Sequence, residues 1–547
     1  MPVHQTSLKR KSIFSNKPFW LFILFFPIAI YFLYIAYYGV NTIFWDEWDT
    51  LPMIHHFLSG SLTFADLWNT HNENRMLFPN LFFLFNVEID NYNTKIEMFV
   101  GGILLLLSFY IMTKIFRARI QKEIFWITPI AFLLFSLSQY ENTLWGFQFA
   151  WYLILACLVL ELYLLEQKEN WGFWLSILLA ICASYSSFQG LFLWLAGFVY
   201  ILLNGCSGFK KVTWTVATLI FTGLYFMGKD LHDIGGSFYP LSHPIESLKF
   251  FLISIGSVIP VSLGYIQPPA FGYFPVEFIG AIFLSLGTYV IVQGIRASGT
   301  DKGYLFPVAL CVYAFLFDLA LLGGRQQLGL LQATVPHYTT YNLLLVIGIY
   351  MGIVNMLKNA SFTQKKTVLY PLMGVVCLLS LTQVLVSYYV GINEGQEFFR
   401  SRIKSAKILA NYSVAPDMMV TNYVTGELSL FRKEAPTLSR YRLSIFDSPT
   451  ASLYAKEGLP LRILPYPPQL SQLLRTDTAL SQAWLLLSEI YDTRGDLQKA
   501  FPKGSPQYIS KLLEWTLSDT DSLRQLVDKY RTNLTYIKNR LQGQLQK

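Results

Sequence analysis

Charge is what this 547-residue chain has least of. Only 14% of its residues are charged and 53% are hydrophobic, whereas an ordinary soluble domain carries about 25% charged residues. This shortage argues against a soluble globular protein and favours one embedded in a membrane. The net charge of +8 is modest, and in membrane proteins Lys and Arg report orientation before anything else. We therefore expect no nucleic-acid partner.

The motifs of several common sites are also missing. The five cysteines are scattered, with no CxxC pair and no His/Cys cluster at zinc spacing, which argues against a disulfide framework and a structural zinc ion. No glycine-rich phosphate loop follows a strand, so a nucleotide-sugar site is not indicated. We expect the cysteines to be small buried side chains; they are Cys157, Cys182, Cys206, Cys311 and Cys377.

Long apolar runs, in contrast, are abundant, and they are long enough to cross the roughly 30 Å hydrocarbon core of a bilayer. The first run, 19–40, follows a basic segment and is not followed by an A-x-A cleavage site. We interpret it as a retained transmembrane helix with a cytoplasmic N-terminus. The other runs lie near 97–113, 124–138, 147–165, 171–185, 189–204, 212–228, 276–295, 304–323, 338–356 and 367–390.

One further run, 246–265, is interrupted by Gly256, Pro260 and Gly264. Basic residues mark cytoplasmic loops, and all four basic loops face the cytoplasm only if this run does not cross completely, which predicts about eleven transmembrane helices (roughly 10–13). A complete crossing would place one later basic loop outside. The four loops carry Lys114, Arg117, Arg119 and Lys122; Lys210 and Lys211; Arg296 and Lys302; and Lys358, Lys365 and Lys366.

This topology divides the chain into three parts. Residues 1–18 form a basic cytoplasmic N-terminus, 19–390 an all-α transmembrane domain whose long first external loop is 41–96, and 391–547 a soluble, mainly helical domain outside. The stretch AWLLLSEIYDTRGDLQKAF at 483–501 is similar to one helical hairpin of a tetratricopeptide repeat. A single copy does not bury a repeat core, so an ordinary pair of helices is the other interpretation.

Acidic residues gather at the start of the first external loop. Asp46, Glu47 and Asp49 follow the first helix directly, interleaved with two tryptophans. Acids at a membrane boundary lose hydration and repel one another, so they usually have a task. A carboxylate there can act as a general base or bind Mg²⁺, Mn²⁺ or Ca²⁺ through oxygen. The other interpretation is the N-terminal cap of an interfacial helix over about 49–59.

The same loop continues with the sequence THNENR. Here His71, Glu73 and Arg75 alternate with two asparagines. An arginine in this position can pair with a phosphate oxygen, and the other two residues can support an acid–base step. A local salt bridge between Glu73 and Arg75 is the alternative.

Three later loops carry polar groups on the same predicted side of the membrane. They contain QYENTLWGFQ, SSFQG, and GGRQQ followed by VPHY. Arg325 is the only Lys or Arg of its loop, and it either holds a lipid phosphate or anchors in the headgroups by snorkelling. Hydrophobic packing alone would not gather five polar segments on one side. The candidates in these loops are Glu141, Asn142, Trp145, Gln148, Gln189, Arg325, His337 and Tyr338.

With these residues, the chain resembles the GT-C superfamily of membrane glycosyltransferases over roughly residues 19–350. An acidic pair, here Asp46-Glu47, opens the first external loop of such enzymes, and the later polar segments resemble those of little-characterised bacterial members. That group is expected to have His in place of Asn74 and Arg in place of His337. The resemblance implies a GT-C-like helical bundle with amphipathic juxtamembrane helices in the first loop, in the plasma (inner) membrane of a bacterium.

The resemblance also implies a chemistry. It is the inverting transfer of a hexosyl or pentosyl group from a polyprenyl-phosphate donor to a glycan, lipid or protein acceptor on the extracytoplasmic face. The implied roles are general base for Asp46, with Glu47 second; acid–base or divalent-cation support for Asp49, Glu73 and His71; donor-phosphate binding for Arg75, Arg325 and His337; and substrate binding for Glu141, Asn142, Trp145, Gln148, Gln189 and Tyr338.

Two other functions stay open. An O-antigen ligase or polysaccharide polymerase also uses lipid-linked sugars, but its main external loop comes late, whereas the acidic loop comes first in this chain. A flippase or transporter of lipid-linked sugars would show internal repeats and ionisable residues near the bilayer midplane. This chain has no clear repeat, and its acids within apolar runs, Glu161 and Asp318, lie nearer a helix end than its middle.

Overall fold

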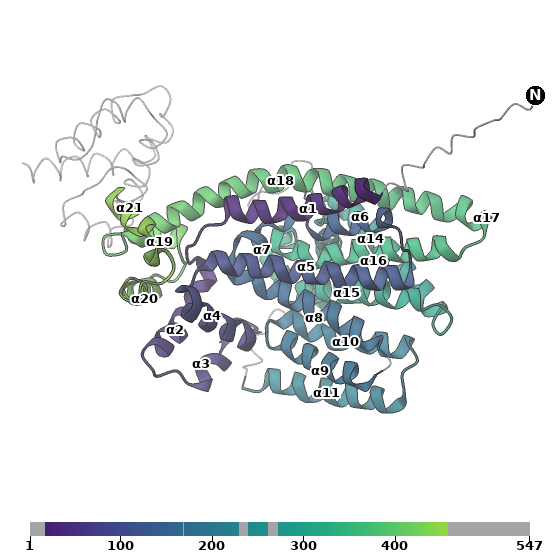
Figure 1. The fold of residues 1–547 in the computed structure, drawn as a ribbon, viewed down its shortest axis with the longest axis horizontal. Coiled ribbons are helices and arrows are strands. Elements are labelled where there is room, and N and C mark those ends of the chain that lie inside the picture. The colour runs from purple at the N-terminus through teal and green to yellow at the C-terminus, as the bar shows by residue number, and fades with distance from the viewer. Residues whose placement is uncertain (1–16, 168, 229–238, 261–271, 458–547) are drawn as a thin grey trace, which may run out of the picture. The chain divides into compact units, whose positions relative to one another are not determined.

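The computed structural model describes residues 17–167, 169–228, 239–260 and 272–457, and these are almost entirely helical (Figure 1). The β structure of these ranges is one short antiparallel hairpin, formed by β1 (Thr70–His71) and β2 (Asn74–Arg75). The predicted helical hairpin at 483–501 and the basic residues before Lys17 lie outside the described residues.

Eight helices of the described ranges are long and apolar enough to cross a membrane. The chain is therefore an all-α polytopic membrane protein, as predicted. The number eleven stays a prediction, because the three remaining predicted runs form α9 (Asn170–Ser184), α10 (Phe192–Leu203) and α11 (Gly208–Phe226), which are shorter or less apolar. The eight are Lys17–Tyr38, Thr94–Arg119, Ile124–Leu144, Gly146–Leu165, Phe274–Arg296, Lys302–Leu328, Pro336–Asn359 and Thr367–Ala410.

The chain forms two compact units. Of the described residues, those within 17–39, 67–79 and 96–396 form the first, called here the membrane unit, and those within 40–66, 80–95 and 397–457 form the second, called the loop unit. Most of the first external loop thus groups with the residues after 396. The predicted boundary at residue 390 lies inside α18 (Tyr370–Ala410), which is a single helix of 41 residues.

The centre of the membrane unit is α16 (Thr339–Asn359). Its residues from Thr339 to Met356 are buried, because it packs against α6 (Ile124–Leu134), α14 (Phe274–Arg296) and α15 (Leu305–Arg325) (Figure 1). The long run of apolar residues in α16 leaves no polar stripe that would face water. Because α16 is packed in this way, it fixes the position of the polar segment directly before it, Pro336–Tyr338.

Glycine allows two helices of the membrane unit to touch through their backbones. The interrupted run forms α13 (Pro244–Gly256), whose 13 residues span only about 20 Å and are too short to cross a bilayer core of about 30 Å alone. A Cβ atom on Gly256 would lie 2.0 Å from the Val276 carbonyl oxygen of α14, and one on Gly280 would lie 1.9 Å from that of Leu252. Only glycine fits at this crossing.

We predict that Gly280→Ala destabilises the protein, by about 1–3 kcal/mol, because its methyl group would overlap a backbone carbonyl that has no room to move. The measurement is thermal unfolding in detergent. The matched control is Gly223→Ala in α11, where nothing lies within 4 Å of the new Cβ. Equal melting temperatures for the two variants would mean that the α13–α14 contact is not tight.

Candidate functional site

Arg75 ties the hairpin β1–β2 to the end of α11. The residue is 4% exposed. Its Nε donates to the Tyr225 carbonyl (2.6 Å), one terminal nitrogen donates to the Trp68 carbonyl (2.9 Å), and the other donates to the carbonyl of Met227. Burial lowers the pKa of this guanidinium, which nevertheless stays charged in proteins. A cation at a helix C-terminus is favourable, so this arrangement gives Arg75 a structural role.

The tip of the hairpin is fixed by two more contacts within the membrane unit. The Asn74 side-chain oxygen accepts from Ser187 Oγ (2.7 Å) and from the backbone N–H of Phe188 (2.9 Å). The Tyr225 hydroxyl donates to the carbonyl of Glu73 at 2.6 Å. Asn72 takes the left-handed conformation in the turn, at φ +50°, which asparagine tolerates well. The backbone of the turn is therefore held from two sides.

Glu73, at this tip, forms an ion pair with Arg325. Their closest atoms are 2.5 Å apart, and Arg325 is the last residue of α15. The side chains are 42% and 34% exposed, respectively, so the pair is open to solvent. The Tyr338 hydroxyl also interacts with the Arg325 guanidinium. The partner of Glu73 in this pair is an arginine more than 250 positions away, and Arg75 is engaged with backbone carbonyls instead.

A second acidic residue meets His337. The carboxylate of Glu141, from α7 (Tyr140–Leu144), lies 2.8 Å from His337 Nδ1. The neighbouring Asn142 side chain donates to the His337 carbonyl and to Thr340 Oγ1, each at 2.8 Å, and Thr340 in turn donates to Gln139 at 2.8 Å. The residues before α16 are thus fixed to the QYENTLWGFQ segment through both backbone and side chains.

Aromatic rings border these polar groups. Trp151 stacks on Tyr341, with ring centroids 4.9 Å apart, and meets the His337 ring at 5.5 Å. The ring of Phe147 stacks on Trp145 at 5.9 Å and meets His71 edge-on at 5.6 Å. Such rings offer broad apolar faces, which fit the C–H face of a sugar ring.

The two predicted glutamines are less accessible. Gln148 and Gln189 are each 7% exposed. Gln148 directly precedes α8 (Phe149–Leu165), while the Gln189 side-chain oxygen lies 2.8 Å from Ser187 Oγ. Their roles in substrate binding stay predictions.

The predicted catalytic acids belong to the loop unit. They form a short 3₁₀ helix, η2 (Trp45–Thr50). Glu47 is fully buried, and its carboxylate accepts from the backbone N–H of Phe44 at 2.8 Å, so this acid caps its own helix. The N-terminal cap considered from the sequence is that of a helix over about 49–59, and this cap is not formed, because Thr50, the residue before α2 (Leu51–Leu58), makes no side-chain capping hydrogen bond. Asp46 is partly exposed and Asp49 is exposed.

Tryptophan and backbone contacts hold this acidic helix in the loop unit. Trp48 is fully buried and packs against Phe431 of α20 (Leu428–Arg440), with ring centroids 5.0 Å apart. Trp45 has a φ of +50°, which is uncommon for a bulky residue. Its N–H donates to the Val424 carbonyl at 2.8 Å, and this bond helps to hold the strained conformation.

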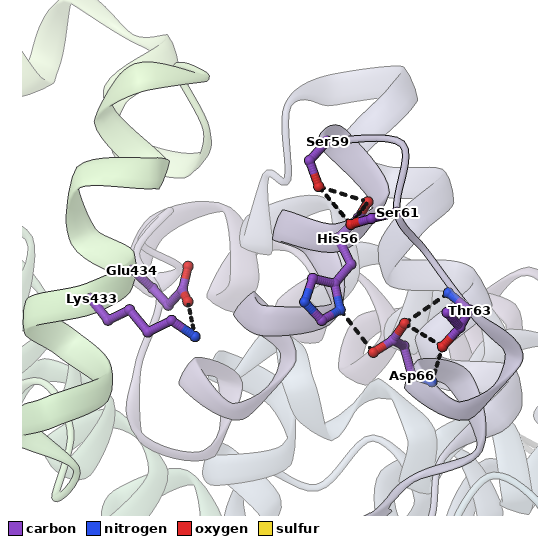
Figure 2. Close-up of polar contacts among 7 residues, drawn as sticks. All are labelled: His56, Ser59, Ser61, Thr63, Asp66, Lys433 and Glu434. Carbon is purple, nitrogen blue, oxygen red and sulfur yellow. Dashed lines mark hydrogen bonds and ion pairs between the residues drawn. The ribbon is translucent and has the colours of Figure 1, made fainter.

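Two histidines follow in α2 (Leu51–Leu58), and each meets a carboxylate of the loop unit. Figure 2 shows His56 facing Asp66 at 2.8 Å, while Asp66 also accepts two hydrogen bonds from Thr63. These bonds from Thr63, with a smaller effect of His56, lower the pKa of Asp66. His55 lies 3.1 Å from the buried Glu434. No group of three or more His, Cys, Asp or Glu suited to a metal ion occurs within the described ranges.

The structure therefore joins four of the five predicted polar segments in one network of the membrane unit, whereas the acidic segment belongs to the loop unit. The network also uses residues that sequence reasoning missed. Ser187 and Thr340 look like ordinary helix-end hydroxyls, Tyr225 and Trp151 lie inside apolar runs, and backbone carbonyls have no sequence signature at all.

We predict that Arg75→Gln destabilises the protein much more than Arg325→Gln does. Loss of Arg75 leaves buried carbonyls without donors and should lower the free energy of unfolding by about 3 kcal/mol, measured by thermal unfolding in detergent. Arg325→Gln removes an exposed ion pair, which contributes about 1 kcal/mol or less. If the arginine variants were equally stable, Arg75 would not be the anchor of the hairpin.

Comparison with known proteins adds no relative. No model of a known protein family matches the chain, and no curated protein matches it either.

Proposed function

We propose that this protein is an integral membrane glycosyltransferase that moves a sugar from a polyprenyl-phosphate donor to a glycan, lipid or protein acceptor. The observation that supports this most is the exposed ion pair between Glu73 and Arg325, set in a fixed network that also contains Glu141, His337 and several aromatic rings. It combines an accessible cation, hydrogen-bonding groups and apolar ring faces in one unit.

Arg325 is the residue proposed to bind the donor phosphate. A guanidinium presents its donors in a planar fork that suits carboxylate and phosphate alike, and the carboxylate of Glu73 now occupies the position of the anion. Exposed ion pairs contribute little stability, so a phosphate group can replace Glu73 at low cost. Arg75 is left out of this role because its donors are engaged with carbonyls.

The sugar and the lipid tail place different demands on the protein. The sugar requires polar groups and a ring face, which His337, Trp145 and Trp151 provide around the network. The lipid tail requires apolar helix surface, which a polytopic membrane protein has in abundance. We propose that both are used on the extracytoplasmic face of the plasma membrane of a bacterium, with the N-terminus in the cytoplasm.

The proposed reaction is a single inverting displacement. The acceptor hydroxyl oxygen forms a bond to the anomeric carbon, the bond from that carbon to the phosphate oxygen breaks with its electron pair, and a base takes the hydroxyl proton. Resemblance to GT-C enzymes implies Asp46 as the base. A divalent cation, if one takes part, would be held by acids such as the partly exposed Asp46 and the exposed Asp49.

We expect the purified protein to bind undecaprenyl phosphate, measured by native mass spectrometry in detergent. Arg325→Gln should raise the dissociation constant about tenfold or more, because one charge-assisted bidentate contact is lost. The matched control is Arg296→Gln, an exposed arginine at the end of α14, which should bind as the wild type does. The phosphate assignment fails if the two variants bind equally.

We expect sugar transfer in proteoliposomes supplied with undecaprenyl-phosphate hexoses and pentoses and a cell-envelope glycan extract. The product is detected by mass spectrometry as a glycan that has gained one sugar, with release of undecaprenyl phosphate. Absence of transfer from every donor would contradict the proposed function.

A flippase of lipid-linked sugars is the second candidate, and it is favoured by two acids in apolar helices. Glu161 of α8 and Asp318 of α15 are fully buried, and both carboxyl oxygens of Glu161 lack a hydrogen-bond partner among the described residues. Ionisable residues inside membrane helices often mark ion or substrate pathways. Movement of the donor across the proteoliposome membrane without sugar transfer, lost in Glu161→Gln, would favour this candidate.

A further inference from the structure

The contact between Glu141 and His337 fixes which nitrogen of the imidazole is protonated. An ionised carboxylate only accepts hydrogen bonds, so the hydrogen of the 2.8 Å contact belongs to His337 Nδ1. In the neutral ring, the other nitrogen, Nε2, then carries a free lone pair. A carboxylate that holds a histidine in this tautomer is a common way to orient a general base.

The imidazole ring of His337 is held in place but stays accessible to solvent. The Asn142 side chain holds the His337 carbonyl, at 2.8 Å, and the ring packs edge-on against Trp151 and Tyr338, at 5.5 and 4.2 Å. The His337 side chain is nevertheless 23% exposed, whereas that of Glu141 is 9% exposed. The geometry therefore presents an oriented imidazole that a ligand can reach.

A free lone pair suits one substrate group better than another. It accepts a hydrogen bond from a hydroxyl group, whereas it repels the oxygens of a phosphate. The phosphate-binding role predicted for His337 thus fits this tautomer poorly. Arg325, in contrast, has only donors and binds an anion. The two residues are joined through Tyr338, which follows His337 directly and interacts with Arg325.

We propose that His337 is the general base that takes the proton of the acceptor hydroxyl, and that Glu141 is the residue that positions it. The proposal rests on the glycosyltransferase function above. The acceptor oxygen bonds to the anomeric carbon, its proton passes to His337 Nε2, and the electron pair of the broken bond leaves with the donor phosphate at Arg325. The nucleophile is accordingly a hydroxyl group, as carried by a sugar, a glycerol headgroup or a Ser or Thr side chain.

Other charged and titratable groups lie near the imidazole. Glu141 faces it from α7, while Tyr338 adjoins it on its own segment. Arg325 and Glu73 act through Tyr338 and carry opposite charges.

The test uses the donor that gives product and measures kcat/KM against pH for the wild type, His337→Asn, Glu141→Gln and Glu141→Asp. An asparagine side chain keeps an N–H group that can donate to Glu141, but it cannot take up the hydroxyl proton. We expect His337→Asn to lower kcat about 10²–10⁴-fold, to remove the acidic limb of the profile, and to leave undecaprenyl phosphate binding unchanged. Glu141→Gln should shift that limb, and Glu141→Asp should restore part of the activity. His243→Asn, at the start of α13, is the control.

Three results would separate the alternatives. If His337→Asn keeps the acidic limb but binds undecaprenyl phosphate weakly, His337 is a phosphate ligand and the proposal is wrong. If Asp46→Asn abolishes transfer while His337→Asn stays within about threefold of the wild type, Asp46 is the base and the glycosyltransferase function survives. If the wild type transfers no sugar, both fail. Should His337→Asn not fold, the pH profile of Glu141→Gln decides, since an unshifted limb overturns the proposal.

Discussion

The donation of one buried guanidinium to three backbone carbonyls is the interaction on which the candidate site depends. Arg75 joins the hairpin β1–β2 to the C-terminal end of α11 through the carbonyls of Trp68, Tyr225 and Met227. A guanidinium is costly to bury unless its N–H donors find acceptors. Because these acceptors belong to two separate segments, the guanidinium fixes one against the other. The position of Glu73 at the tip follows from that anchor.

Two kinds of polar contact coexist around the tip, and they suit different tasks. The contacts of Arg75, Asn74 and Asn142 are buried or partly buried and hold loops in place. The ion pair of Glu73 and Arg325 is open to solvent, and an exposed pair is easily exchanged. A rigid frame that presents one exchangeable pair matches what an enzyme for a charged lipid requires: the frame stays fixed while the ligand replaces one internal partner.

The sequence predicts the helical fold and the grouping of the polar loops because both depend on simple patterns. Apolar run lengths identify spans, and basic loops place HNENR, QYENTLWGFQ, SSFQG and GRQQ on one predicted side. The partners of Arg75 are not predictable, since any residue has a carbonyl. The burial of Glu47 and the continuity of α18 past residue 390 are not predictable from composition either. Charged residues such as Glu397 and Arg400 resemble a loop in composition, but they are 2.6 Å apart on the surface of α18 and form a pair of the kind that stabilises a helix.

The glycine contact between α13 and α14 has a consequence for biosynthesis. A 13-residue apolar helix is too short to be recognised as a membrane span on its own, and it leaves the ribosome before its partner does. Its stable position depends on backbone contact with Val276 and Gly280, which are translated later. The close contact between α13 and α14 can therefore form only after α14 has been synthesised.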